Sequence, residues 1–136
     1  MKWIWLSILI YFIGYVWDVI MHLTTEIKIE YIPAPHATMM IGIVLSAIAV
    51  LRYRIVFKDQ NKWLMALNLI AVIIMTIGSL WDNFGYHIRG IEPAANAMPH
   101  LLLRYGGYLF LLLTIIISIK QLFLRNRNNK GASLSQ

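Results

Sequence analysis

Histidine and aspartate residues recur with nearly the same spacing in the two halves of this 136-residue chain. All four histidines and two of the three aspartates fall into two groups, Asp18, His22 and His36, and Asp82, His87 and His100. Neutral imidazole supplies nitrogen ligands and carboxylate supplies oxygen and negative charge, so such sets are typical of iron, zinc or copper sites. The sequence therefore predicts a transition-metal site at these six residues, as two mononuclear sites or one dinuclear centre.

The composition places these residues in a membrane. Hydrophobic residues make up 60% of the chain and charged residues 13%, with a mean hydropathy of +0.67, against about 45–50% and 25% in a soluble domain. Four apolar stretches, each near the ~20 residues of a membrane span, cover about 3–22, 37–57, 63–82 and 98–119. They predict an all-α integral membrane protein with four transmembrane helices. No small-x-small cleavage site follows the first stretch, so we expect a retained helix and not a signal peptide.

The two halves resemble each other as a tandem duplication. A shift of 64 residues aligns Trp17-Asp18 with Trp81-Asp82, and Pro35-His36 with Pro99-His100. Each unit predicts one helical hairpin, in a single domain over 1–125 with repeats over about 3–57 and 63–120. Two hairpins of the same orientation would be related by a pseudo-two-fold axis along the membrane normal. Residues 126–136 are expected to form a polar, frayed cytoplasmic tail.

Basic residues predict the orientation. The net charge of +6 comes from 12 Lys+Arg and 6 Asp+Glu, and in a membrane protein it is a topology signal and not a sign of nucleic-acid binding. Most basic residues lie in the link after the second stretch and in the C-terminal tail, at Arg52, Arg54, Lys58, Lys62, Lys120, Arg125, Arg127 and Lys130. The two remaining loops hold Lys28 and Arg89, with Glu26, Glu30 and Glu92. By the positive-inside rule both termini are cytoplasmic and the histidines lie toward the outer face of the cell membrane.

Local spacing predicts how the polar side chains converge. Asp18 and His22 are four residues apart and share a helix face. Asp82 and His87 are five apart, so they converge only if the helix forms a π-bulge or ends early, near Gly85. Pro35 and Pro99 suit the first turn of the returning helices.

Other interpretations of the same residues remain open. Arg104 could pair with either aspartate in a purely structural brace. The tryptophans are typical interface anchors, and the methionines near the histidines, Met21, Met39, Met40 and Met98, are more often core filler than soft copper ligands. Tyr86 and Tyr105 could serve redox or proton transfer, although interfacial tyrosines are common. The sequence also allows two other functions for the protein. It could be an electron carrier that binds b-type haem, or an accessory subunit without catalytic activity.

The pattern Asp-x-x-x-His, a proline-containing loop and a histidine opening the next helix, as in Asp18, His22 and His36, resembles the C subunit of the copper membrane monooxygenases. The resemblance covers about residues 14–110 and implies copper at this first site. It also implies that Asp82, His87 and His100 match a second cluster, with aspartate where that family has asparagine and one extra residue before the first histidine. Those enzymes oxidise methane, ammonia or short alkanes together with other subunits. The expected partners are therefore the lipid bilayer, other membrane subunits or further copies of the chain.

Overall fold

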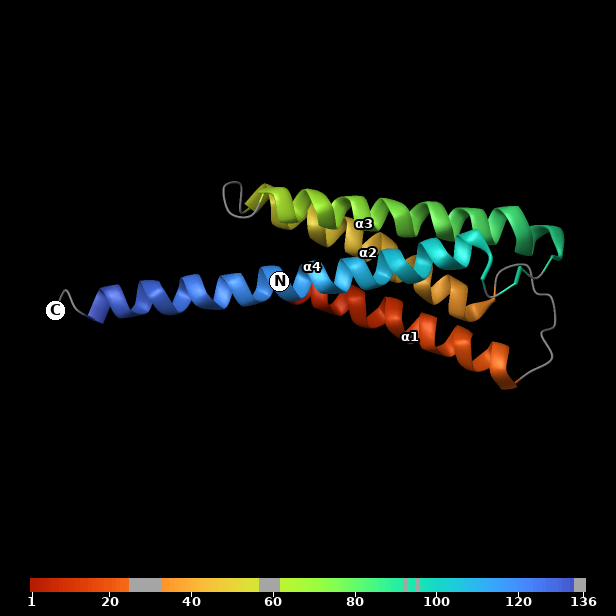
Figure 1. The fold of residues 1–136 in the computed structure, drawn as a ribbon, viewed down its shortest axis with the longest axis horizontal. Coiled ribbons are helices and arrows are strands. Elements are labelled where there is room, and N and C mark those ends of the chain that lie inside the picture. The colour runs from red at the N-terminus through yellow and green to blue at the C-terminus, as the bar shows by residue number, and fades with distance from the viewer. Residues whose placement is uncertain (25–32, 57–61, 92, 95, 134–136) are drawn as a thin grey trace.

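Four long helices form the molecule. The computed structural model describes residues 1–24, 33–56, 62–91, 93–94 and 96–133. Over these residues it contains α1 (Lys2–Thr24), α2 (Ala34–Val56), α3 (Lys62–Leu80) and α4 (Met98–Ser133), with a π-helical turn, η1 (Trp81–Tyr86), and a 3₁₀ turn, η2 (His87–Arg89), after α3 (Figure 1). All four helices are long and apolar enough to cross a membrane, the third span running on through both turns. The prediction of an all-α, four-span membrane protein is confirmed.

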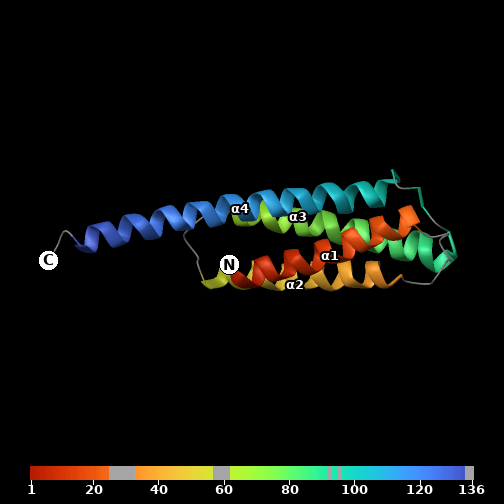
Figure 2. The same cartoon turned by 90° about the horizontal axis from the view of Figure 1, so that it is seen from below.

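The helices pack as two hairpins side by side. α1 packs along α2, and α3 packs along α4, while α2 joins the hairpins by packing against α3 (Figures 1 and 2). α1 and α4 make far fewer contacts, so the seam between them is the loosest in the bundle. The C-terminal end of α1, the turns after α3 and the N-terminal ends of α2 and α4 lie together at the end of the bundle opposite the C-terminus (Figure 1).

Glycines set the close packing within each hairpin. A Cβ atom added at Gly14 would lie 2.8 Å from the backbone of α2 at Met39, and one added at Gly42 would lie 2.6 Å from the backbone of α1 at Tyr11. Gly78 approaches the α4 backbone at Pro99 in the same way, at 2.9 Å. Small residues let membrane helices approach until their backbones touch. These contacts bring the ends of the helices, and the polar residues on them, close together.

Several polar side chains are buried in the bundle beside its apolar core, and large apolar side chains cover much of its outer surface. The buried polar side chains belong to Ser7, His36, Ser46, Asn68, Ser79, Asp82, Asn83, His87 and Thr114. Large apolar side chains such as Leu9, Ile41 and Ile70 are about half exposed. A soluble monomer rarely exposes contiguous apolar surface on this scale, which suits a surface that faces lipid.

The fourth helix extends beyond the expected span. It continues to Ser133, so 126–133 are helical where the sequence suggested a frayed tail, and α4 projects past the other helices (Figures 1 and 2). Residues 126–130 contain only Asn, Arg and Lys, none of which breaks a helix, and α4 already provides the preceding turns. Several charges that predict the orientation, on Glu26, Lys28, Glu30, Lys58 and Glu92, lie outside the described residues, and the orientation stays a prediction.

Candidate metal centre

The structure brings all six predicted residues together at the end of the bundle opposite the C-terminus. Asp18 and His22 come from the last turns of α1, His36 from the first turn of α2, Asp82 from η1, His87 from η2, and His100 from the first turn of α4. Each member lies within 4 Å of at least one other, and His36 links the two aspartates, so the six residues form one cluster and not two.

His36 lies at the centre of this cluster and links the two hairpins. Its Nε2 atom is 2.9 Å from Oδ1 of Asp18, and its Nδ1 atom is 3.0 Å from Oδ2 of Asp82. On the α1 side, Nε2 of His22 is 3.6 Å from Oδ2 of Asp18. His36 is only 1% exposed and Asp82 is fully buried. The carboxylates of the two halves therefore share one imidazole.

A change of helix geometry brings His87 to Asp82. The α-helix gives way to the π-helical turn at Trp81, and the 3₁₀ turn begins at His87. The Nε2 atom of His87 then lies 3.8 Å from Oδ2 of Asp82, although the two residues are five apart. The expected π-bulge near Gly85 is confirmed. A Cβ at Gly85 would lie 2.8 Å from the indole ring of Trp81, so a side chain larger than hydrogen would push against the turn.

The returning helices present their histidines from the first turn. Pro35 and Pro99 are the second residues of α2 and α4, as expected, so each proline precedes a histidine that is already helical. The Nε2 atom of His100 reaches Oδ1 of Asp82 at 3.2 Å. Asp82 thus has histidines from α2, η2 and α4 around one carboxylate.

His36 and His100 each contact a second acceptor besides Asp82. These second contacts determine which ring nitrogen carries the hydrogen and which has a free lone pair. Nδ1 of His100 is 3.1 Å from the carbonyl oxygen of Ala94, which can only accept, so this nitrogen carries the hydrogen. Nε2 of His36 donates in the same way to Asp18. In the neutral rings, Nε2 of His100 and Nδ1 of His36 are then bare and both point at Asp82.

These contacts with Asp82 lack the angles of hydrogen bonds. Nδ1 of His36, Nε2 of His100 and both carboxylate oxygens of Asp82 have no hydrogen-bond partner among the described residues. Lone pairs that face one another away from water repel unless positive charge lies between them. A proton on either ring nitrogen would give an ion pair with Asp82 at these distances, and a metal cation would supply the same positive charge. The donor set and its geometry fit a bound cation.

Three of these residues form a group that can hold a metal ion. His36, Asp82 and His87 are all buried, and one ligand atom from each lies within 4.8 Å of the others. The group takes its members from both halves of the chain, as in the shared centre that the sequence left open beside two separate sites. Which metal occupies it is not determined by this geometry, because two imidazoles and a carboxylate suit several.

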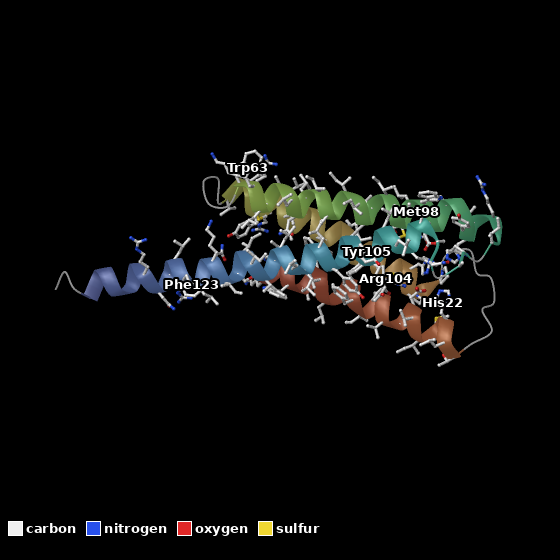
Figure 3. The ribbon with its side chains drawn as sticks, in the orientation of Figure 1. His22, Trp63, Met98, Arg104, Tyr105 and Phe123 are labelled. Carbon is white, nitrogen blue, oxygen red and sulfur yellow. The ribbon has the colours of Figure 1, made fainter. Side chains whose placement is uncertain are left out.

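Among the described residues, Arg104 does not form the structural brace with an aspartate that the sequence left open. Every ion pair of Asp18 and Asp82 with another described residue is to a histidine, so Arg104 pairs with neither aspartate. Met39 belongs to the hydrophobic core and Met98 is exposed, as are Trp17 and Trp81. Tyr105, labelled on α4 in Figure 3, is 62% exposed. These residues behave as core and surface residues.

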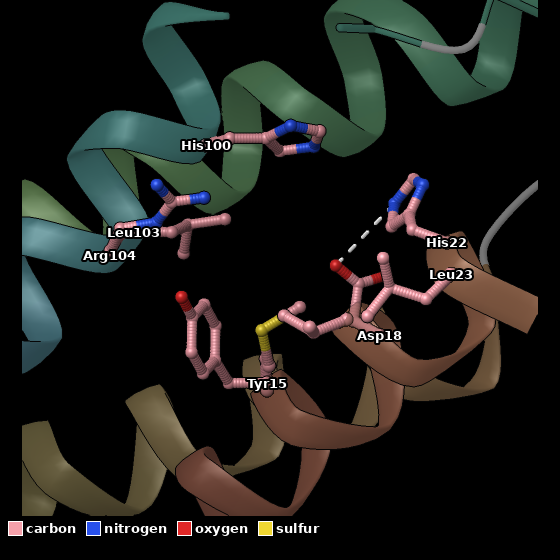
Figure 4. Close-up of a pocket in the computed structure, with 9 residues that line it drawn as sticks. Tyr15, Asp18, His22, Leu23, His100, Leu103 and Arg104 are labelled. Carbon is pink, nitrogen blue, oxygen red and sulfur yellow. Dashed lines mark ion pairs between the residues drawn. The ribbon is translucent and has the colours of Figure 1, made fainter. Parts of the chain in front are cut away.

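A cavity of about 150 Å³ adjoins the cluster in the loose seam between α1 and α4. Asp18, His22 and His100 line one part of it, and Tyr15 and Arg104 line another (Figure 4). It is smaller than the roughly 300–1,000 Å³ of sites for drug-sized ligands. A cavity of this size has no room for a porphyrin between α1 and α4.

Two residues of this region were not anticipated. Asn83 is 1% exposed beside Asp82; its amide donates to the carbonyl of Ser79 at 2.8 Å, and its Oδ1 has no hydrogen-bond partner in the described part of the chain. Its position next to an intramembrane aspartate was the available signal in the sequence. Tyr15 lines the cavity, and nothing in the sequence separates it from the other tyrosines near helix ends.

Comparisons with protein-family models, with curated proteins and with solved structures find no match to this chain. The four membrane-spanning helices and the buried histidine–aspartate group fit a multi-pass membrane protein that can bind metal.

Proposed function

We propose that this protein is a membrane metalloprotein that holds a transition-metal ion in the cluster around Asp82. The observation that carries the proposal is the fully buried carboxylate of Asp82, whose oxygens lie 3.0 Å from Nδ1 of His36 and 3.2 Å from Nε2 of His100 without hydrogen-bond angles. A buried charge in a bilayer is costly, so intramembrane carboxylates with nearby partners are characteristic of functional sites. A metal cation compensates the carboxylate and accepts the imidazole lone pairs.

Each residue has a distinct part in this proposal. His36, Asp82 and His87 are the ligands, because their donor atoms converge. Asp18 orients His36, because a carboxylate that accepts the second N–H of a ligating imidazole fixes its tautomer and raises its basicity. The carbonyl of Ala94 does the same for His100, which is the further ligand nearest to Asp82. His22 holds the other oxygen of Asp18.

Copper or iron is the metal we propose. A bound copper or iron ion supplies one-electron redox chemistry, whereas a zinc ion has no redox chemistry. The resemblance of Asp18, His22 and His36 to the copper membrane monooxygenase C subunit favours copper. On that basis the finer proposal is an oxidoreductase role within a larger membrane assembly, with the single metal cluster near the outer face.

Elemental analysis of the purified protein tests the proposal. The protein is expressed with an affinity tag that contains no histidine, purified in detergent, and measured for copper, iron and zinc together with its optical spectrum. His36→Ala/His100→Ala is compared with Asn68→Ala, which removes an equally buried polar side chain of α3, about 20 Å along the helix from Asp82.

We expect close to one or two equivalents of copper or iron per chain in the unmodified protein and in Asn68→Ala, and little in His36→Ala/His100→Ala. A Soret band would instead identify haem. If the unmodified protein stays without metal after reconstitution with each ion, or if the histidine variant retains the full amount, the cluster is a structural brace in an accessory subunit and the proposal is wrong.

A further inference from the structure

The cavity beside the cluster has a charged end that the metal proposal does not use. It is lined by residues of α1 and α4 with one of α2, namely Tyr15, Asp18, Val19, His22, Leu23, Met39, His100, Leu103 and Arg104. In Figure 4, Arg104 and His100 extend from α4 toward a central space that Tyr15, Asp18 and His22 of α1 border on the other side. Arg104 is the only Lys or Arg among these residues.

Arg104 has a buried N–H donor, at Nε, that is not used within the described part of the chain. It forms no ion pair with a described carboxylate, and its Nε atom is buried without a hydrogen-bond partner among the described residues. A guanidinium presents Nε–H and a terminal N–H as a planar fork that fits a carboxylate with two parallel hydrogen bonds. The hydroxyl of Tyr15 points toward the same place in Figure 4 and is already a hydrogen-bond partner of Arg104 and of Tyr108. The Nε–H of Arg104 is the donor that remains, and an anion would supply its partner.

The rest of the cavity limits the size and charge of that anion. Val19, Leu23 and Leu103 form apolar walls, and the volume of about 150 Å³ is that of a cavity that accepts benzene. Asp18 also lines the cavity and repels negative charge, which disfavours a doubly charged group such as phosphate. The cavity therefore favours a single carboxylate on a small apolar body.

We propose that the seam between α1 and α4 binds a small monocarboxylate, with its carboxylate on Arg104 and its apolar body against Val19, Leu23 and Leu103. Binding of the acid needs only these residues. Its role as a substrate rests on the proposed function, because the bound molecule would lie beside His22 and His100, where a metal ion would act on it. Such a molecule comes from water as a short acid or from the bilayer as a fatty acid whose chain leaves through the seam.

Calorimetric titration with benzoate tests the inference. The full-length protein is placed in nanodiscs of phosphatidylcholine, which add no net negative charge, and benzoate is compared with the neutral benzyl alcohol. Arg104→Met removes the fork, and Arg125→Met makes the same change on an exposed site near the far end of α4. Arg104→Lys keeps the charge without the planar fork. The metal content of each sample is measured in parallel.

We expect Arg104→Met to weaken benzoate binding by roughly tenfold or more, the size of a lost charge-assisted pair, with Arg104→Lys in between and Arg125→Met unchanged. Benzyl alcohol should bind weakly to every variant. Displacement of benzoate by oleate would assign the ligand to the bilayer, and its failure to displace would assign it to water; both outcomes support the site.

Equal affinity for benzoate and benzyl alcohol in the unmodified protein overturns the inference without any variant. So does benzoate affinity that is the same in Arg104→Met and in the unmodified protein. Metal-loaded protein with no Arg104-dependent binding overturns this inference alone. Arg104-dependent binding by protein that never takes up metal overturns the proposed function alone.

Discussion

The Nδ1 atom of His36, at the start of α2, lies 3.0 Å from the Oδ2 atom of Asp82, on the π-helical turn that follows α3. This contact crosses from one hairpin to the other. A site built on it belongs to the assembled bundle and cannot form in either hairpin alone. Metal binding and the packing of α2 on α3 should therefore depend on each other.

Replacing the central carboxylate should remove the metal with little change of shape. Asp82→Asn keeps the size of the side chain and deletes the charge that the cation balances. We expect metal affinity to fall by more than the roughly 10–100-fold that loss of an outer-shell partner causes, measured by competition with a chelator of known affinity. Asp59→Asn, in the predicted cytoplasmic link, is the matched control and should keep its metal. Retention of full affinity by Asp82→Asn would contradict the ligand assignment.

Replacing the orienting carboxylate should have a smaller effect. Asp18 contacts His36 through the nitrogen that does not face Asp82, so Asp18→Asn weakens the hold on the ring without removing a ligand. Affinity should drop by about 10–100-fold, while the number of metal ions bound at saturation stays the same. If Asp18→Asn instead binds fewer metal ions per chain at saturation, Asp18 is itself a ligand, at a second metal ion.

Acid should release the metal. Imidazole binds a metal ion only in its neutral form, so every ligand proton competes with the metal and binding releases protons. Affinity should be highest above neutral pH and should fall as the pH drops and protons occupy the imidazole nitrogens. Equilibrium dialysis from pH 8 to pH 5 measures this, with Asn68→Ala following the same curve. A flat profile would exclude histidine from the ligand set.

The glycines of the hairpins should not tolerate larger residues. A Cβ at Gly42 would lie 2.6 Å from the backbone of Tyr11, so Gly42→Leu must separate α1 from α2. We expect a loss of stability of about 1–3 kcal/mol or more, seen as a lower midpoint of unfolding in detergent and as reduced metal content. Val44→Leu, on the exposed side of the same helix, is the control. Equal midpoints for the two variants would show that the contact is not required.

Much of this protein follows from its sequence alone. Four apolar stretches of the length of a bilayer determine four helices, because backbone polar groups in lipid must be bonded within a helix. The paired spacings of aspartate and histidine place the polar residues at one end of the bundle. Gly85, between Asp82 and His87, signals the irregular turn that joins them. The length of α4 was underestimated, because a polar sequence that would not span a bilayer can still continue an existing helix.

The tertiary structure alone decided how the two halves combine. A period of 64 residues places each aspartate near the histidines of its own hairpin and says nothing about the packing of one hairpin on the other. That packing places His36 between Asp18 and Asp82, and it leaves Arg104 beside a cavity and apart from both carboxylates. Ligand sets made across hairpins depend on side-chain directions at a helix interface, which spacing along one chain does not determine.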